Sequence, residues 1–151
     1  MRRILLDTNV LLLYLVGISV PQHLSWKRLA EFDVDDVKRL QHEARGHKHV
    51  GLPNLLTEAS NFLGSGKDEA FQGAAMLLRN YCQKLDESFL PSMGLAKHPL
   101  YTRLGLSDTA IYCLSDSEMK VVTVDFELSG LLTEKGVHVV NLRHYKTPRG
   151  R

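Results

Sequence analysis

The stretch RRILLDTNVLLLYLVG, residues 2–17, places an acid, a hydroxyl and an amide between two apolar runs. These polar residues are Asp7, Thr8 and Asn9, and the runs on either side are typical of a buried strand followed by a buried helix. An ionised carboxylate that is removed from water costs several kcal/mol unless another group compensates its charge. The stretch therefore predicts that the rest of the chain supplies a partner for Asp7.

Other apolar runs of the chain alternate between two lengths. Short aliphatic or β-branched runs predict strands at 3–7, 48–52, 87–90, 120–125 and 137–142. Longer stretches with apolar residues at helical spacing predict helices at 10–17, 33–46, 53–64, 68–85 and 107–115, the last with Ser107 as its N-cap. Because strands that alternate with helices favour a parallel sheet covered on both faces, we expect an α/β domain.

Length and charge limit the class of protein further. The chain has 151 residues, of which 44% are hydrophobic, so it is long enough for one domain with a sizeable core. The apolar run 10–16 is too short to span a membrane and no signal-peptide pattern follows Arg2 and Arg3, so we expect a cytoplasmic protein. We assign 1–142 to the domain and 143–151, which holds four basic residues and no acid, to a tail that is solvated or that contacts phosphate or an acidic partner.

Two pairs of residues suggest metal or redox chemistry but have simpler explanations. Cys82 and Cys113 have no CxxC spacing, so we interpret them as buried free thiols. His47 and His49 alternate before a strand, but two ligands without a third do not make a zinc site, so we expect them to be solvent-exposed.

Four acids stand where they converge if the predicted sheet is parallel. Asp7 and Asp125 each end a predicted strand, and chemistry in such sheets gathers outside the carboxyl ends of the strands. Glu58 lies along the margin of an apolar helical stripe, and Asp108 occupies the core-facing side of a first helical turn. Each acid alone also has a structural explanation, as a strand-end residue, a helix-edge residue or a cap.

Convergence of these four carboxylates predicts a bound cation. Like charges at one edge of a sheet repel each other, so either their pKa values rise or a cation neutralises them. Oxygen ligands without His or Cys favour Mg²⁺ or Mn²⁺. Such an ion polarises a phosphodiester and orients a water, so the pattern favours hydrolysis of a nucleic-acid backbone.

Four sequence motifs resemble, in order and spacing, those of the PIN-domain ribonucleases. They are ILLDTNVLL, LTEASNFL, LSDTAIYCLS and VVTVDFEL, and the resemblance runs from residue 3 to about residue 142. It implies a three-layer α/β/α sandwich around a central, mostly parallel sheet of about five strands, and Mg²⁺- or Mn²⁺-dependent cleavage of single-stranded or structured RNA. It carries Asp7, Glu58, Asp108 and Asp125 over as the catalytic, metal-binding acids.

The same resemblance implies supporting residues and partners. Asn9 and Thr123 match polar positions that support the metal or its water, and Glu127 matches a further acid. Members commonly form homodimers, and toxin members of toxin–antitoxin pairs are held inactive by an antitoxin protein. Residues 18–48 resemble a variable region that often forms a clip or a substrate-contacting helical hairpin.

Basic and aromatic residues suggest where RNA binds. Lys97, His98 and Arg103 precede Asp108, so we predict that they bind a substrate phosphate, with decoration of an exposed helix as the alternative. Trp26, next to Lys27 and Arg28, is a candidate for base stacking but more often anchors packing.

Two other functions compete with a metal-dependent endoribonuclease. A phosphatase with an aspartyl-phosphate intermediate normally needs a second acid two residues after the nucleophile, where this chain has Asn9, so we disfavour it. A non-catalytic PIN-like module that binds RNA or scaffolds a complex stays open as the alternative.

Overall fold

The structure, a computed structural model, describes residues 2–64 and 67–143 and contains one five-stranded sheet in which every strand pair is parallel. The strand order is β3-β2-β1-β4-β5. The strands are β1 (Arg3–Leu6), β2 (Lys48–Gly51), β3 (Asp86–Glu87), β4 (Met119–Thr123) and β5 (His138–Asn141).

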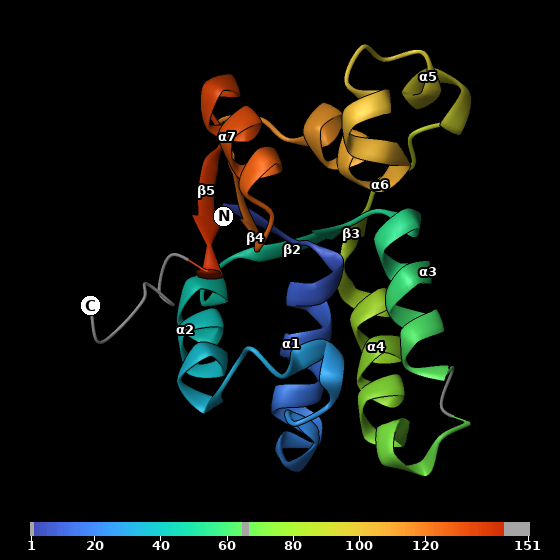
Figure 1. The fold of residues 1–151 in the computed structure, drawn as a ribbon, viewed down its shortest axis with the longest axis vertical. Helices are drawn as coiled ribbons and strands as arrows, with labels where there is room; N and C mark the ends of the chain where they lie inside the picture. Colours follow the sequence, from blue (N-terminus) through green and yellow to red (C-terminus); the bar gives the residue numbers. More distant parts are fainter. Residues whose placement is uncertain (1, 65–66, 144–151) are drawn as a thin grey trace.

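Helices cover both faces of this sheet (Figure 1), which confirms the predicted α/β sandwich with its parallel sheet. The α-helices are α1 (Thr8–Ser19), α2 (Val34–Ala44), α3 (Pro53–Phe62), α4 (Gln72–Lys84), α5 (Ser92–Ala96), α6 (Tyr101–Leu114) and α7 (Phe126–Lys135). Single 3₁₀ turns occur at η1 (Pro21–His23), η2 (Lys27–Leu29) and η4 (Glu69–Phe71).

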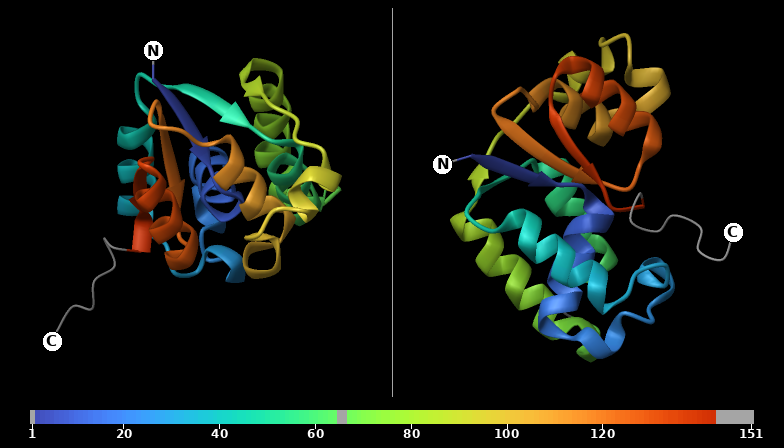
Figure 2. Two further views of the ribbon diagram at one scale, coloured as in Figure 1. Left: turned by 90° about the horizontal axis from the view of Figure 1, so that it is seen from above. Right: turned by 90° about the vertical axis from the view of Figure 1, so that its left-hand side faces the viewer.

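Alternating side chains of the strands build two hydrophobic cores, one on each face of the sheet. In β1, Ile4 and Leu6 join the core with α1, α2 and α4, whereas Leu5 joins the core with α6 and α7. Helix α3 stands at the margin and contributes to both, through Leu56 to the first core and Leu55 to the second. Figure 2 shows the two groups of helices on opposite sides of the strands. A central strand that is apolar on both faces is what a parallel sheet requires.

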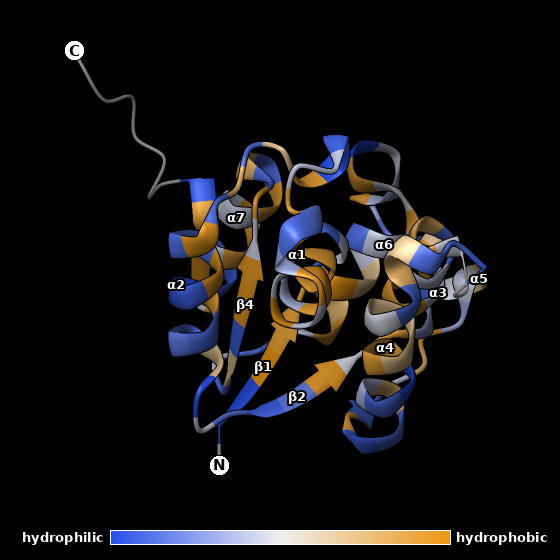
Figure 3. Cartoon of the chain, turned by 90° about the horizontal axis from the view of Figure 1, so that it is seen from below, coloured by the Kyte–Doolittle hydropathy of each residue, from blue (hydrophilic) through white to orange (hydrophobic). Residues whose placement is uncertain are grey.

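Helix α1 is buried nearly all round because it lies between the sheet and three other helices, α2, α3 and α4. In Figure 3 its hydrophobic residues and those of β1 lie at the centre of the molecule, whereas α2 presents a hydrophilic outer side. Helix α1 has 12 residues, and no helix in the described ranges is long and apolar enough to cross a membrane.

Several local predictions need correction. The strand predicted at 87–90 is the two-residue β3, and the helix predicted from Ser107 begins at Tyr101, although it is interrupted at Gly105. Sequence reasoning did not predict α5. The thiols Cys82 and Cys113 are free, as expected, but both are exposed rather than buried, because each lies in the last turn of its helix.

The structure corrects the prediction for His49 and agrees with the packing role expected for Trp26. His49 is half-buried rather than solvent-exposed, because its Nδ1 lies 2.8 Å from the Tyr81 hydroxyl and its ring packs against Tyr14. Trp26 packs against Phe71 with 4.7 Å between ring centroids, which agrees with the packing role.

Candidate active site at the carboxyl edge of the sheet

The order of the strands places a cavity between the carboxyl ends of β1 and β4. The chain runs outward from β1 to β2 and β3, then returns to β4 on the other side of β1. At such a switch point neighbouring connections leave in opposite directions and open a crevice, which is where α/β proteins bind ligands. The cavity there has a volume of about 500 Å³, and Asp7, Glu58, Asp108 and Asp125 all line it.

Asp7 follows β1 directly and caps α1. Its Oδ1 accepts the Thr8 backbone N–H at 2.7 Å, and its Oδ2 accepts the Thr123 hydroxyl at 2.8 Å. Burial raises the pKa of Asp7, the hydrogen bonds from Thr123 and Thr8 oppose the rise, and the charges of Asp125 and Glu58 add to it. The carboxylate is therefore held in place by two donors while its burial disfavours the charge.

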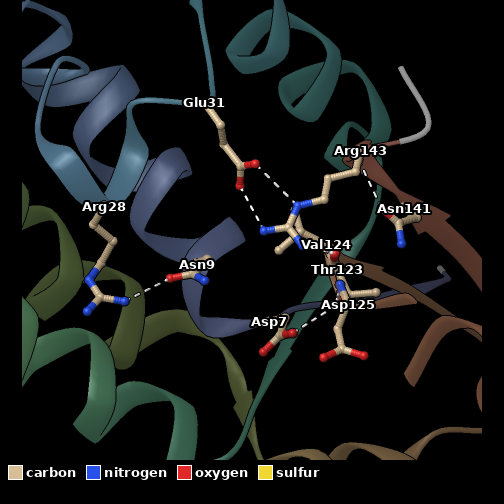
Figure 4. Close-up of polar contacts among 9 residues, drawn as sticks. All are labelled: Asp7, Asn9, Arg28, Glu31, Thr123, Val124, Asp125, Asn141 and Arg143. Carbon is tan, nitrogen blue, oxygen red and sulfur yellow. Dashed lines mark hydrogen bonds and ion pairs between the residues drawn. The ribbon is translucent and has the colours of Figure 1, made fainter. Parts of the chain in front are cut away.

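Thr123, the last residue of β4, connects Asp7 to Asp125. Its O–H donates to Asp7, and its oxygen accepts the Asp125 backbone N–H at 3.1 Å (Figure 4). Asp125 in turn is the N-cap of α7, because its Oδ1 accepts the Leu128 N–H at 2.8 Å. Asp125 can therefore cap α7 and line the cavity at the same time. Thr123, which the family resemblance matches to a supporting position, hydrogen-bonds to both Asp7 and Asp125.

Glu58 links three helices at the cavity. Its Oε1 accepts the Ser107 hydroxyl of α6 at 2.5 Å and, more weakly, the Thr8 hydroxyl of α1 at 3.4 Å. The predicted inward lean of Glu58 agrees with this position. The sequence predicts Ser107 as an N-cap, but Ser107 lies inside α6, two residues after the break at Gly105, and its hydroxyl donates to Glu58.

Asp108 shows that the four acids share one electrostatic environment. Its pKa is raised to about 7, first by burial and then by the charges of Asp7, Asp125 and Glu58. Gly105, with φ of 78° and ψ of −178°, breaks α6 three residues earlier, so Asp108 stands near the start of a new helical segment. Four carboxylates from α1's N-cap, α3, α6 and α7's N-cap therefore act on one another, as their predicted convergence requires.

Two arginines also line the cavity. Arg28 of η2 donates to Asn9 Oδ1 at 3.4 Å, and its guanidinium carbon lies 3.5 Å from the centroid of the Phe62 ring. Arg143 donates to both carboxylate oxygens of Glu31 at 3.2 Å and to the Val124 carbonyl at 2.9 Å. Figure 4 shows the two side chains reaching toward Asn9 and Val124 from different elements.

Some residues predicted for the site do not line the cavity. Arg103 and Glu127 form an exposed ion pair with each other at 3.0 Å, with side chains about half exposed. His98 accepts the Leu100 N–H and packs edge-on against Tyr112, and Lys97 is an exposed residue at the end of α5. These four side chains belong to the outer layer formed by α5, α6 and α7 and the turn between α5 and α6.

Four other lining residues were missed as members of the site. Thr8 and Ser107 each stand next to a predicted acid in the sequence, so their position was a usable signal. In the sequence, Arg28 stands out only as a neighbour of Trp26, and Arg143 falls at the start of the basic tail, yet its side chain contacts the domain. Neither arginine has a local sequence signal for this cavity, since folding alone brings it there. Residues 144–151 of the predicted tail lie outside the described residues.

The cavity offers the donor set of a hard cation. Its acidic ligands are all oxygens, and burial without a compensating charge raises the pKa values of Asp7 and Asp108. Among residues 2–64 and 67–143, no three His, Cys, Asp or Glu side chains are already arranged around one metal position.

Comparison with known proteins adds no family assignment: no family model matches the chain, and no curated protein is similar enough to count as a relative.

Proposed function

We propose that this protein is a metal-dependent endoribonuclease that hydrolyses RNA phosphodiester bonds with Mg²⁺ or Mn²⁺. The observation that carries the proposal is the convergence of four mutually repelling carboxylates in one cavity at the switch point of a parallel sheet. The resemblance of the four motifs to PIN-domain ribonucleases supports the same function.

Asp7, Glu58, Asp108 and Asp125 would hold the cation. When bound, the ion would neutralise these acids, polarise the phosphodiester and lower the pKa of a bound water. The protein prepares the acids for this task. Thr123 and the Thr8 N–H restrain Asp7, and the N–H of Leu128 restrains Asp125, so hydrogen bonds fix the orientation of these two carboxylates.

Nucleic acid is the substrate class that suits the basic lining of the cavity. Arg28 places positive charge in the same cavity as the acids, where a polyanionic backbone needs it, whereas Arg143 is paired with Glu31. The toxin role, the homodimer and the antitoxin partner stay predictions from the family resemblance.

Substitution of single acids tests the proposal. We expect Asp125→Asn and Asp7→Asn to lower Mn²⁺-stimulated cleavage of total RNA by at least about 100-fold, since loss of a metal ligand should exceed the effect of losing a supporting residue. Asp125→Asn is the cleaner variant because Asn is also a good N-cap. The matched control is Asp116→Asn, an exposed acid that pairs with Arg3 outside the cavity.

Cleavage is measured by mapping RNA ends after incubation with Mn²⁺ or with EDTA, with all variants purified in parallel. Equal cleavage by wild type and both cavity variants would reject the catalytic assignment. If the wild-type protein shows no metal-dependent turnover on any RNA, the non-catalytic RNA-binding or scaffold module becomes the better interpretation.

A further inference from the structure

The two arginines of the cavity differ in how much of their charge is already compensated. Arg143 faces the Glu31 carboxylate through two hydrogen bonds and also donates to the Val124 carbonyl. These contacts fasten the segment before α2 to the carboxyl end of β4. Arg143 therefore braces the wall of the cavity, and Glu31 offsets most of its attraction for an anion.

Arg28 has no such partner among the described residues. Its guanidinium donates to a neutral group, the Asn9 side-chain oxygen, at 3.4 Å, near the upper limit for a hydrogen bond. A guanidinium carries five N–H donors, so several of them are left for a ligand. In the described part of the chain, Arg28 is thus the cavity cation that a carboxylate does not neutralise.

Phe62 gives Arg28 an unusual platform. It is the last residue of α3, four residues after Glu58, so that both side chains project from the same face of the helix into the cavity lining. Phe62 is 37% exposed, and the guanidinium carbon of Arg28 lies over its ring at 3.5 Å from the centroid. Stacking on the ring orients the guanidinium plane and keeps its in-plane N–H groups available.

We infer that Arg28 and Phe62 form the nucleotide-binding element of this site. The guanidinium donates to a phosphate oxygen of the strand next to the bond that is cut, and an unpaired base stacks on the surface that Arg28 and Phe62 present. Asn9 acts as a positioning residue, because its amide oxygen holds the guanidinium on the cavity side. The inference rests on the proposed function and deepens it by naming the residues that would hold an unstacked, unpaired nucleotide of the RNA.

The stacking surface is the reason that an unpaired nucleotide is expected. A base in a continuous duplex has both faces covered by its neighbours, whereas a base in a loop or single strand is free to stack on an aromatic ring or a guanidinium plane. Contact to phosphate alone would not discriminate between the two forms of RNA.

Binding is measured apart from cleavage, in the Asp125→Asn background. Fluorescence anisotropy follows a labelled, unstructured ten-nucleotide RNA and the same strand in a blunt duplex, with Mg²⁺ and with EDTA. We expect Arg28→Ala and Phe62→Leu each to weaken single-strand binding by about tenfold. Arg28→Lys should keep part of the salt dependence but bind more weakly than Arg28, since an ammonium does not stack as a plane.

Two further variants make the result specific. Arg45→Ala removes an exposed arginine at the amino-terminal side of β2, away from the cavity, and should change binding less than twofold. Arg103→Ala tests the phosphate site that the sequence suggested. Arg28 and Phe62 are both exposed, so thermal melting of each variant verifies that the fold is retained.

Three outcomes would overturn the inference: unchanged single-strand binding in both Arg28→Ala and Phe62→Leu, a loss of the same size in duplex binding by Phe62→Leu, or no measurable single-strand binding by the cleavage-inactive protein. The first would leave the proposed nuclease activity intact. If the protein proves not to cleave RNA, the binding assay still tests Arg28 and Phe62, because it does not require turnover.

Discussion

The carboxylate of Asp7 accepts hydrogen bonds from neutral donors rather than from a basic side chain. The two donors are the Thr8 N–H and the Thr123 hydroxyl, one for each oxygen. They reduce the penalty of burial but do not remove it, because the pKa of Asp7 is still raised. At the scale of single residues, the site is therefore built to hold negative charge that the protein alone compensates only in part.

Asp108 should make the metal-free protein less stable as the pH rises. Its pKa of about 7 lies above the ordinary value of 3.8, so the folded state binds more protons than the unfolded state between these values. Stability is then highest below pH 4 for this group and declines as pH rises through 7. In EDTA at pH 8, Asp108→Asn should melt about 3 °C or more above wild type, corresponding to about 1 kcal/mol after solvent screening.

At pH 4 the two proteins should melt together, because Asp108 is protonated in the folded state. Asp116→Asn, which changes an exposed acid, serves as the control at both pH values. A wild-type protein that is more stable than Asp108→Asn at pH 8 in EDTA would contradict the assigned environment of this group.

Helix α6 shows how one backbone break positions two polar side chains. Gly105 adopts φ of 78° and ψ of −178°, a conformation that residues with a Cβ rarely enter. The break lets residues 101–104 follow one direction and lets the next segment begin at the cavity, where Ser107 reaches Glu58. The element boundary, rather than the helical periodicity, thus decides where Asp108 stands.

Gly105→Ala should therefore damage both stability and the site. A Cβ at Gly105 meets no atom within 4 Å, so the effect isolates backbone strain from steric overlap. We expect a loss of about 1–3 kcal/mol in unfolding free energy and reduced RNA cleavage, measured by denaturant melts and end mapping. Gly130→Ala in the interior of α7 also meets open space and should instead be neutral or stabilising by up to about 1 kcal/mol. Equal effects of the two substitutions would count against strain at Gly105.

Over the whole molecule, the sheet order concentrates acidic groups at one edge. Asp7 and Asp125 follow β1 and β4, the neighbouring strands at the switch point. Helix α3, which follows β2, brings Glu58 to the cavity, and α6, which precedes β4, brings Asp108. A cation bound there would couple to global folding, because the unfolded chain does not hold these acids together.

Mn²⁺ should accordingly raise the melting temperature of the wild-type protein. The shift should grow with the logarithm of the Mn²⁺ concentration. The free energy of unfolding should rise by about 2.7 kcal/mol at a Mn²⁺ concentration of a hundred times the dissociation constant. The shift in melting temperature should be smaller at pH 5 than at pH 8, because Asp108 is protonated at the lower pH and its proton competes with the metal. Differential scanning fluorimetry of wild type and Asp125→Asn measures the shift, and identical shifts in both would argue against a metal in this cavity.

The sequence by itself determined the fold class and most of the elements. The apolar runs before Asp7 and Asp125 are strands because aliphatic residues on both faces suit a central parallel strand, and the helical spacing around Glu58 predicted α3 and its inward acid. These features are local, so periodicity and capping preferences record them. The short β3 and α5 are too brief for such a signal.

Only the tertiary structure decided which side chains complete the cavity. Arg28 and Arg143 come from segments far from the acids in sequence, and their contacts to Asn9, Phe62 and Val124 depend on how those segments pack. The same packing pairs Arg103 with Glu127 and so keeps both out of the cavity. Long-range contacts of this kind leave no periodic pattern in the chain, because they are selected by the geometry of the assembled layers rather than by neighbouring residues.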